Sequence, residues 1–247
     1  MSPVLSSLHL ARRFALFALT LLFLLTALRA GLVLVHDASV VPEGRVSALF
    51  IQGWRVDLAL IGVLLLPAVS VAPLLGAFAA GRGLARLLVS AWLTVSVFGV
   101  LLLEYLTPAL LRAEGVRPDQ SLLLDPARAS ASLLGNLQAF PVQAVLGAVL
   151  IVLVLIAFRY RLDTQRLLVR RLSLGSALAL SLFGTLLCLI AAWSGIPGVS
   201  EPLTLAATRI GGVAPPVDEL VLNTAWKVLY PPVIEPLLSL LSNVPHR

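Results

Sequence analysis

Long apolar runs alternate with polar intervals along most of this chain. An α-helix needs about 20 mainly apolar residues to cross the hydrocarbon core of a bilayer. Five runs are long enough, at about 14–36, 58–80, 84–103, 140–158 and 172–193. The pattern therefore predicts an all-α polytopic membrane protein, in which residues 1–193 form a domain of five transmembrane helices.

The remaining residues, 194–247, follow a different pattern. They are rich in proline and glycine and contain no run that is long enough to cross a membrane. Within them, Asp218–Tyr230 begins with two acids and places apolar residues such as Leu222 and Trp226 at helical spacing. We therefore expect an external tail next to the membrane that carries an interfacial helix. A second amphipathic stretch, Pro126–Leu137, is also expected to lie on the external membrane surface.

The composition supports a membrane protein rather than a soluble one. Of the 247 residues, 59% are hydrophobic and only 12% are charged, whereas a soluble domain carries about 25% charged residues. The net charge of +6 does not indicate nucleic-acid binding, because the basic residues lie in short loops between apolar runs. Lipid head groups and topology account for basic residues in such loops. We therefore expect membrane lipids as partners and no nucleic acid.

The placement of basic residues predicts the orientation in the membrane. The N-terminal segment and two short loops combine nine arginines with a single acid, Asp163. The arginines are Arg12, Arg13, Arg82, Arg86, Arg159, Arg161, Arg166, Arg170 and Arg171. Because basic residues in short segments beside helix ends tend to stay inside, we expect a cytoplasmic N-terminus. Residues 37–57, the interval 104–138 and the tail would then lie outside.

No motif of a catalytic or metal site is present in the sequence. The histidines, His9, His36 and His246, lie in different segments, whereas a metal site needs clustered ligands. The single lysine, Lys227, is not part of a glycine-rich phosphate loop. The single cysteine, Cys188, lies in an apolar run and is expected to be an inert apolar residue. We therefore predict no catalytic residue, no metal ligand and no cofactor in this chain.

Charged residues at the expected external helix ends are the candidates for a binding site. Arg55 and Asp57 precede the second helix, Glu104 follows the third, and Arg117 lies in the polar interval after it. Arginine offers a planar fork of donors that suits phosphate, so these four residues are a candidate site for a lipid head group. Exposed ion pairs, worth about 0–1 kcal/mol each, are the commoner explanation for such a set. At a helix start, Asp57 would also complement the helix dipole.

Three places along the chain, at 53–58, 104–119 and 222–226, carry a resemblance to a known family. Residues 53–58 read Gly-Trp-Arg-Val-Asp-Leu, residues 104–105 read Glu-Tyr, and residues 114–119 read Glu-Gly-Val-Arg-Pro-Asp. Residues 222–226 read Leu-Asn-Thr-Ala-Trp. In this order along five helices, the segments resemble the N-terminal membrane domain of the lipoteichoic acid synthase-like phosphoglycerol transferases. These are bacterial cell-envelope enzymes of the sulfatase superfamily, and the likeness covers most of residues 14–230.

The resemblance implies a membrane anchor for the transfer of phosphoglycerol, or of a related phospho-group, outside the bacterial cytoplasmic membrane. In such enzymes an external sulfatase-like domain carries a threonine nucleophile and a divalent metal. No threonine with the carboxylates and histidines of such a site occurs in this sequence. The resemblance therefore implies a membrane-anchoring and lipid-substrate-binding domain. We expect its catalytic domain in a separate chain or in a continuation of the reading frame.

A non-enzymatic membrane protein, such as a transporter subunit or an assembly factor, is the alternative. The five helices do not divide into two equal halves, as the repeats of many transporters do. Apart from Arg29, the apolar runs contain almost no charge. Because Arg29 lies near the end of the first run, we interpret it as an anchor that reaches the interface rather than as part of an ion pathway. These features argue against an ion-coupled transporter but are compatible with an interaction module.

Overall fold

The computed structural model describes residues 3–35, 45–114, 117–125, 172–194 and 219–237. Isolated positions are also described, at 127, 130–131, 134–135, 138, 147–149, 151–152, 154, 156, 203–204 and 208. Within this part of the chain all regular structure is helical, and no strand is present. The predicted all-α class is therefore confirmed.

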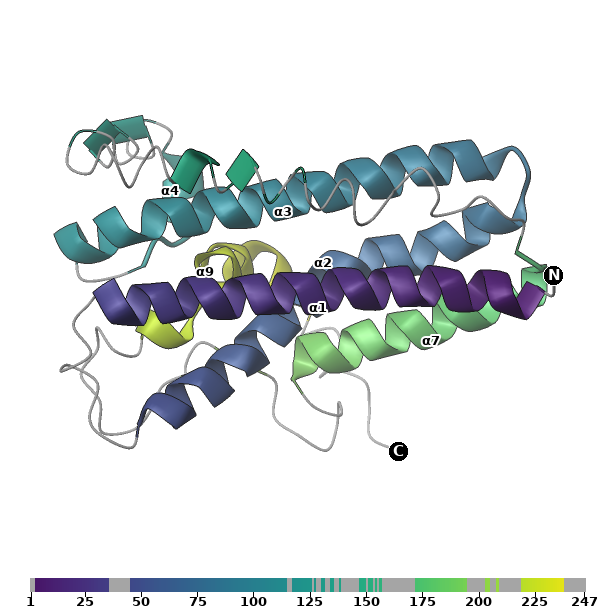
Figure 1. Ribbon diagram of the computed structural model, residues 1–247, viewed down its shortest axis with the longest axis horizontal. Coiled ribbons are helices and arrows are strands. Elements are labelled where there is room, and N and C mark those ends of the chain that lie inside the picture. Colours follow the sequence, from purple (N-terminus) through teal and green to yellow (C-terminus); the bar gives the residue numbers. More distant parts are fainter. Residues whose placement is uncertain are drawn as a thin grey trace.

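Four long helices dominate the described residues: α1 (Pro3–Val35), α2 (Val46–Ala77), α3 (Gly81–Glu114) and α7 (Leu174–Trp193). Figure 1 shows α1, α3 and α7 running along the long axis of the molecule, with α2 crossing between them. All four contain a stretch that is long and apolar enough to cross a membrane. This arrangement fits a multi-pass membrane protein.

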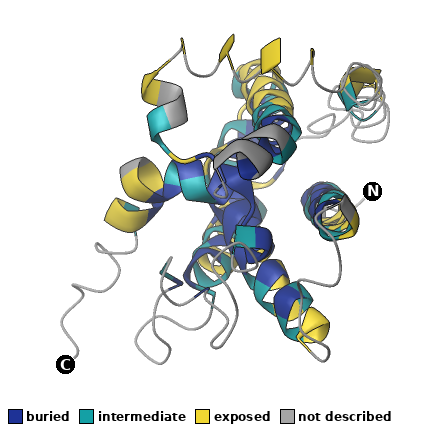
Figure 2. Cartoon of the chain, turned by 90° about the vertical axis from the view of Figure 1, so that its left-hand side faces the viewer, coloured by how far each residue is buried: buried dark blue, intermediate teal, exposed yellow. Residues whose placement is uncertain are grey.

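Large apolar side chains cover the outer faces of these helices. Phe23 on α1, Leu87 on α3 and Leu182 on α7 are all exposed. Figure 2, which views the molecule from the end where α9 lies, shows buried residues gathered in the middle and exposed ones on the outer helix faces. In lipid, such apolar faces need no protein partner. The exposed surface therefore agrees with the apolar pattern of the sequence.

The observed helix boundaries correct several predicted ones. Helix α1 begins at Pro3 rather than at 14, and α2 begins at Val46 rather than at 58. Helix α3 continues through Pro108 to Glu114 rather than ending at 103. The physical reason is that arginine, glutamine and glutamate are good helix formers. Polar residues at these positions therefore interrupt the apolar pattern without ending the helix.

The fifth predicted helix, at 172–193, agrees closely with α7. Its start is fixed by Ser173, whose hydroxyl accepts a 3.2 Å hydrogen bond from the backbone N–H of Ser176. It ends at Ser194, which adopts a left-handed conformation with φ of 60°. The predicted helix at 140–158 and the stretch Pro126–Leu137 lie mostly outside the described residues, although their described positions are largely helical. The basic loop 159–171 lies wholly outside them.

Helices α2 and α7 form a close antiparallel pair, which we call the α2–α7 seam. A Cβ atom at Gly62 would lie 2.6 Å from the backbone oxygen of Cys188, so the two backbones nearly touch. Further along, the hydroxyls of Ser70 and Thr185 are 2.7 Å apart, and Ser181 donates to the backbone oxygen of Ser70 at 2.6 Å. Small residues and neutral hydrogen bonds therefore hold this seam together.

The segment 219–237 lies among the helices. It contains a helical turn at 219–221, the short helix α9 (Thr224–Leu229) and the π-helix η4 (Tyr230–Ile234). We expected Asp218–Tyr230 to lie on the membrane surface, but every residue from Leu220 to Trp226 is buried. Figure 1 shows α9 between the long helices, and it contacts α2 and α3. The backbone of residues 220–226 can be irregular here because these residues are buried against α2 and α3.

Candidate functional site

The first buried ion pair joins α1 to α2. Arg29 donates from Nη1 to Oδ2 of Asp57 and from Nη2 to Oδ1, each at 2.7 Å. The side chains are 2% and 0% exposed, respectively. Two parallel charge-assisted bonds of this kind are the strongest form of an arginine–carboxylate contact. The pair therefore fixes both the spacing and the register of the two helices.

A glycine makes room for this pair. Arg29 Nη2 also donates to the backbone oxygen of Gly53 at 3.2 Å. A Cβ atom at position 53 would lie 2.3 Å from the Cζ atom of Arg29 and would displace the guanidinium. Gly53 therefore lets the guanidinium lie directly against the backbone of α2.

Asn223 ties the C-terminal segment to the first pair. Its Nδ2 donates to Oδ1 of Asp57 at 2.9 Å. Its Oδ1 accepts a 2.6 Å hydrogen bond from the backbone N–H of Trp226, so the same side chain caps α9. Asparagine suits this double role because its amide carries both donors and an acceptor.

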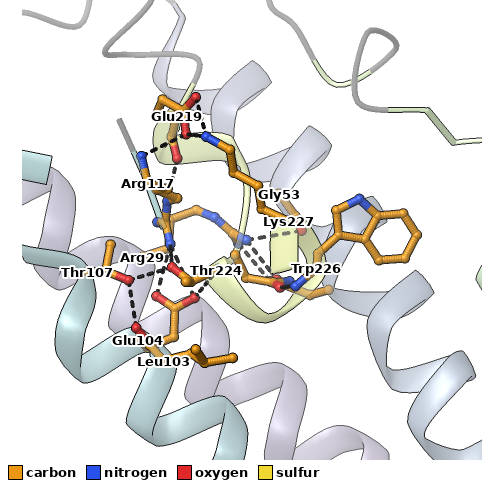
Figure 3. Close-up of polar contacts among 12 residues, drawn as sticks. Arg29, Gly53, Leu103, Glu104, Thr107, Arg117, Glu219, Thr224, Trp226 and Lys227 are labelled. Carbon is orange, nitrogen blue, oxygen red and sulfur yellow. Dashed lines mark hydrogen bonds and ion pairs between the residues drawn. The ribbon is translucent and has the colours of Figure 1, made fainter. Parts of the chain in front are cut away.

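The second buried ion pair joins α3 to the chain that follows it. Nη1 of Arg117 donates to both oxygens of Glu104, at 3.0 and 3.2 Å, and to Thr224 Oγ1 at 3.0 Å. The backbone N–H of Thr224 donates to Glu104 Oε1 at 2.5 Å. Thr107 is hydrogen-bonded through its hydroxyl to that of Thr224 and donates to the backbone oxygen of Leu103. Figure 3 shows these side chains converging on the start of α9.

Glu219 and Lys227 form the outer edge of this second network. Arg117 donates from Nε to the backbone oxygen of Glu219 at 2.5 Å and from its backbone N–H to Oε2 at 3.1 Å. Lys227 Nζ lies 2.9 and 2.8 Å from the two carboxylate oxygens of Glu219. Both side chains are partly exposed, whereas Arg117 and Glu104 are buried. The polar network therefore extends from the protein interior toward the surface.

The two ion pairs meet at neighbouring residues, because Asn223 binds the first pair and Thr224 the second. We call Arg29, Asp57, Glu104, Arg117, Asn223 and Thr224 the charged junction. Its charges balance, because Arg29 binds Asp57 and Arg117 binds Glu104. At its outer edge, Lys227 likewise binds Glu219. Breaking a buried pair of this kind costs about 3–5 kcal/mol, because one charge stays behind without a partner.

Two aromatic rings follow the junction, that of Trp226 in α9 and that of Tyr230 in η4. Trp226 is fully buried, and its ring centroid lies 5.8 Å from that of Tyr230 in a tilted arrangement. Burial, together with the nearby carboxylate of Glu235, raises the pKa of Tyr230. The phenol is therefore neutral at physiological pH, and we assign these rings to packing rather than to proton transfer.

Three of the four predicted site residues, Asp57, Glu104 and Arg117, come together in the junction. The fourth does not: Arg55 is half-buried and faces the end of α7. There its Nε donates to Ser194 Oγ at 3.1 Å, and its Nη1 donates to Gln52 Oε1 at 2.8 Å. The structure therefore brings three of the four residues together and places Arg55 on different partners.

Two interpretations of single residues were wrong. Asp57 lies well inside α2, not at its start, so it does not serve the helix dipole. Glu104 and Arg117 form a buried pair rather than an exposed one. The apolar runs at 58–80 and 84–103 leave Asp57, Glu104 and Arg117 outside the predicted helices, which is why these residues were expected to be exposed.

Arg29 was also misinterpreted, as an anchor at the membrane interface. It is 2% exposed and bound on both Nη atoms. The available signal was that a charge within a membrane segment usually faces the bundle interior and pairs with an opposite charge. Asp57 was the matching acid. Asn223 and Thr224 carried no such signal beyond their place in the resembling segment 222–226.

The polar groups of the junction bind one another and tie α1, α2 and α3 to residues 219–227. Among the described residues, no group of three or more histidine, cysteine, aspartate or glutamate side chains could hold a metal ion. The buried carboxylates of Asp57 and Glu104 are already bound by guanidinium groups.

Comparisons with models of protein families, with curated proteins and with solved structures found no match to this chain.

Proposed function

We propose that this chain is the membrane-anchoring domain of a lipoteichoic acid synthase-like phosphoglycerol transferase of the bacterial cytoplasmic membrane. One observation carries the proposal: residues from all three resembling segments meet in the charged junction. Segment 53–58 supplies Gly53 and Asp57, the stretch 104–119 supplies Glu104 and Arg117, and 222–226 supplies Asn223 and Thr224. When several segments build one structural feature, we expect the members of a family to share all of these segments.

The junction suggests what the anchor does. It holds α9 against α2 and α3, so a chain that continues beyond residue 237 would leave the bundle close to this point. A sulfatase-like catalytic domain, in the same chain or as a separate partner, would thereby be held at one distance and orientation from the membrane. Its threonine nucleophile and divalent metal belong to that domain and have no counterpart among the junction residues.

The proposed orientation places the N-terminus in the cytoplasm and the junction at the external side. Arg12 and Arg13 lie near the start of α1, and Arg82 and Arg86 near the start of α3. Figure 1 shows these two starts at the same end of the bundle, away from α9. The positive-inside rule favours this end for the cytoplasm. The proposed topology also includes a fifth membrane helix at 140–158 and an external tail from 194 onward.

Deleting the gene in its native host tests the transferase assignment. We expect phosphoglycerol-modified glycolipids, measured by mass spectrometry of a total lipid extract, to fall in the deletion strain. Wild-type protein should restore them, and Asp57→Asn should not, because the anchor would no longer seat its C-terminal segment. Ser70→Ala, a change in the α2–α7 seam, serves as the matched control and should restore them. An unchanged pool in the deletion strain would refute the transferase assignment.

Reporter fusions test the orientation separately. Alkaline phosphatase is active only outside the cytoplasm, so a fusion after residue 237 should be active and a fusion at the N-terminus should not. The reverse result would contradict the proposed topology while leaving the helix assignments intact.

A non-enzymatic membrane protein, such as an assembly factor or a transporter subunit, is the second candidate. The observation that favours it is the balanced charge of the junction, whose ion pairs are satisfied within the chain itself. Such a junction would serve any membrane protein that must hold a re-entrant segment. The lipid analysis above distinguishes the two, because only the transferase assignment predicts a change in phosphoglycerol-modified lipids.

A further inference from the structure

Helix α7 gives a measure of depth in the membrane. It has 20 residues, which at 1.5 Å per residue correspond to about 30 Å, the thickness of the hydrocarbon core. A helix of this length that crosses the membrane must have its two ends at the two boundaries. Ser194 directly follows its last residue, so it lies at the level of the head groups of one leaflet.

Arg55 lies at this same level. Its Nε donates to the hydroxyl of Ser194 at 3.1 Å. The preceding residue, Trp54, is 47% exposed and donates from its indole nitrogen to the hydroxyl of Thr26 at 3.0 Å. Tryptophan is enriched at membrane–water boundaries because its ring is apolar and its N–H is polar. Two independent features therefore place the guanidinium of Arg55 at the boundary.

The charge of Arg55 is not balanced by its bonded partners. Among the described residues, its hydrogen-bond partners are Ser194 and Gln52, which are both neutral. The acid closest in sequence, Asp57, is already bound by Arg29 and Asn223. In the junction, by contrast, each guanidinium binds a carboxylate. Within the part of the chain that the structure describes, the guanidinium of Arg55 therefore has no bonded carboxylate, and it lies at the depth of the lipid phosphates.

We propose that Arg55 binds a phosphate ester anion at the external membrane boundary, with Ser194 and Gln52 holding its guanidinium in place. The planar fork of arginine matches the oxygens of a phosphate monoester or diester. An anionic lipid head group and a soluble glycerol phosphate offer the same chemistry. The inference goes beyond the proposed anchoring function and rests on the chain crossing the membrane, but not on transferase activity.

Lipid retention by the purified full-length chain tests the site. Protein would be placed in nanodiscs of phosphatidylcholine with phosphatidylglycerol, and the retained lipids counted by native mass spectrometry. We expect Arg55→Gln to lower retained phosphatidylglycerol by about fivefold or more, as for the loss of a charge-assisted bond. Arg55→Lys should lower the retained phosphatidylglycerol by less, because the positive charge remains.

Arg86→Gln is the matched control. Arg86 lies near the start of α3, at the opposite boundary, and the change removes the same charge. This variant should retain phosphatidylglycerol as the wild type does. Equal losses of phosphatidylglycerol in both variants would indicate a general attraction between positive charge and anionic lipid. No loss in Arg55→Gln would mean that Arg55 does not contact the lipid. Either result would overturn the proposal that Arg55 binds a lipid head group.

Glycerol 3-phosphate, added to nanodiscs that contain only phosphatidylcholine, tests whether Arg55 binds a soluble phosphate ester. Binding that disappears in Arg55→Gln but not in Arg86→Gln would assign the site to a soluble phosphate ester. The proposal as a whole fails if neither arm depends on Arg55. Size-exclusion chromatography and thermal unfolding would verify that each variant is folded. Such a failure would not affect the transferase assignment, because that assignment is tested separately by measuring phosphoglycerol-modified lipids in the deletion strain.

Discussion

The α2–α7 seam and the charged junction hold the same helix, α2, by different physical means. In the seam, close backbone approach at Gly62 combines with neutral hydrogen bonds of Ser70 and Ser181. In the junction, fully buried charges bind one another, and Asn223 adds a bond from a distant segment. The seam covers a long stretch of α2, whereas the junction is confined to one level.

The difference between the two regions shows how a membrane-embedded fold tolerates single substitutions. Apolar contacts between helices bring no net hydrophobic gain, since lipid tails are equally apolar, so packing and polar bonds decide which helices associate. Losing one neutral bond in the seam removes a small stabilising contribution. Losing one partner in the junction leaves a buried charge without compensation, which is much more costly. We therefore expect the two regions to respond very differently to single substitutions.

The largest effect is expected for Asp57→Asn. The change keeps the size of the side chain but leaves Arg29 charged and 2% exposed, which should lower the free energy of unfolding by about 3–5 kcal/mol. Denaturation by SDS titration in mixed micelles would measure it. The double variant Arg29→Met with Asp57→Leu should recover most of the loss, because no charge remains. A loss below about 1 kcal/mol in the single variant would mean that the pair is not buried.

Asn223→Ala should have the next largest effect. It removes the cap of α9 and the bond to Asp57, worth about 1 kcal/mol for a cap and about 1.5–3 kcal/mol for a bond to a charged group. Hydrogen exchange of residues 219–230 should rise more than that of α7. Ser173→Ala, which removes only the exposed cap of α7, is the control and should cost about 1 kcal/mol. Equal costs for the two caps would contradict a special role for Asn223.

Gly62→Ala probes the seam at its closest approach. The added Cβ would lie 2.6 Å from a backbone oxygen of α7, so the two helices must move apart. Overpacking of this kind costs about 1–3 kcal/mol. In the same helix pair, Gly175 has no atom within 4 Å of the position of its Cβ. Gly175→Ala should therefore be neutral or slightly stabilising, and a similar loss in both variants would argue against close packing at Gly62.

The smallest effect is expected for Ser70→Ala. Its hydroxyl lies 2.7 Å from that of Thr185, and neutral hydrogen bonds between membrane helices contribute about 0.6 kcal/mol on average. Thr20, whose hydroxyl donates only within its own helix to the oxygen of Leu16, gives a control without a cross-helix bond. Thermal unfolding in detergent should show a small decrease for Ser70→Ala and almost none for Thr20→Ala. A loss for Ser70→Ala comparable to that for Asp57→Asn would remove the contrast between seam and junction.

The candidate site was only partly predictable. Asp57 and Glu104 stood out as charges beside long apolar runs and Arg117 as an arginine of the polar interval, and all three are in the junction. Arg55 stood out for the same reason but faces α7, because it lies two residues before Asp57 and helix geometry turns neighbouring side chains to different faces. Asn223 and Thr224 resemble many other polar residues of the tail and gave no local sign of their role.

The sequence by itself determined the class of protein, because an apolar run of about 20 residues has few stable alternatives to a helix in lipid. It also determined the start of α7, where Ser173 provides a local cap. Only the tertiary structure decided which charges pair. Arg29 and Asp57 are 28 residues apart, and Asn223 lies 166 residues beyond Asp57. Partners at such distances depend on how the helices pack, and periodicity within one helix carries no information about that.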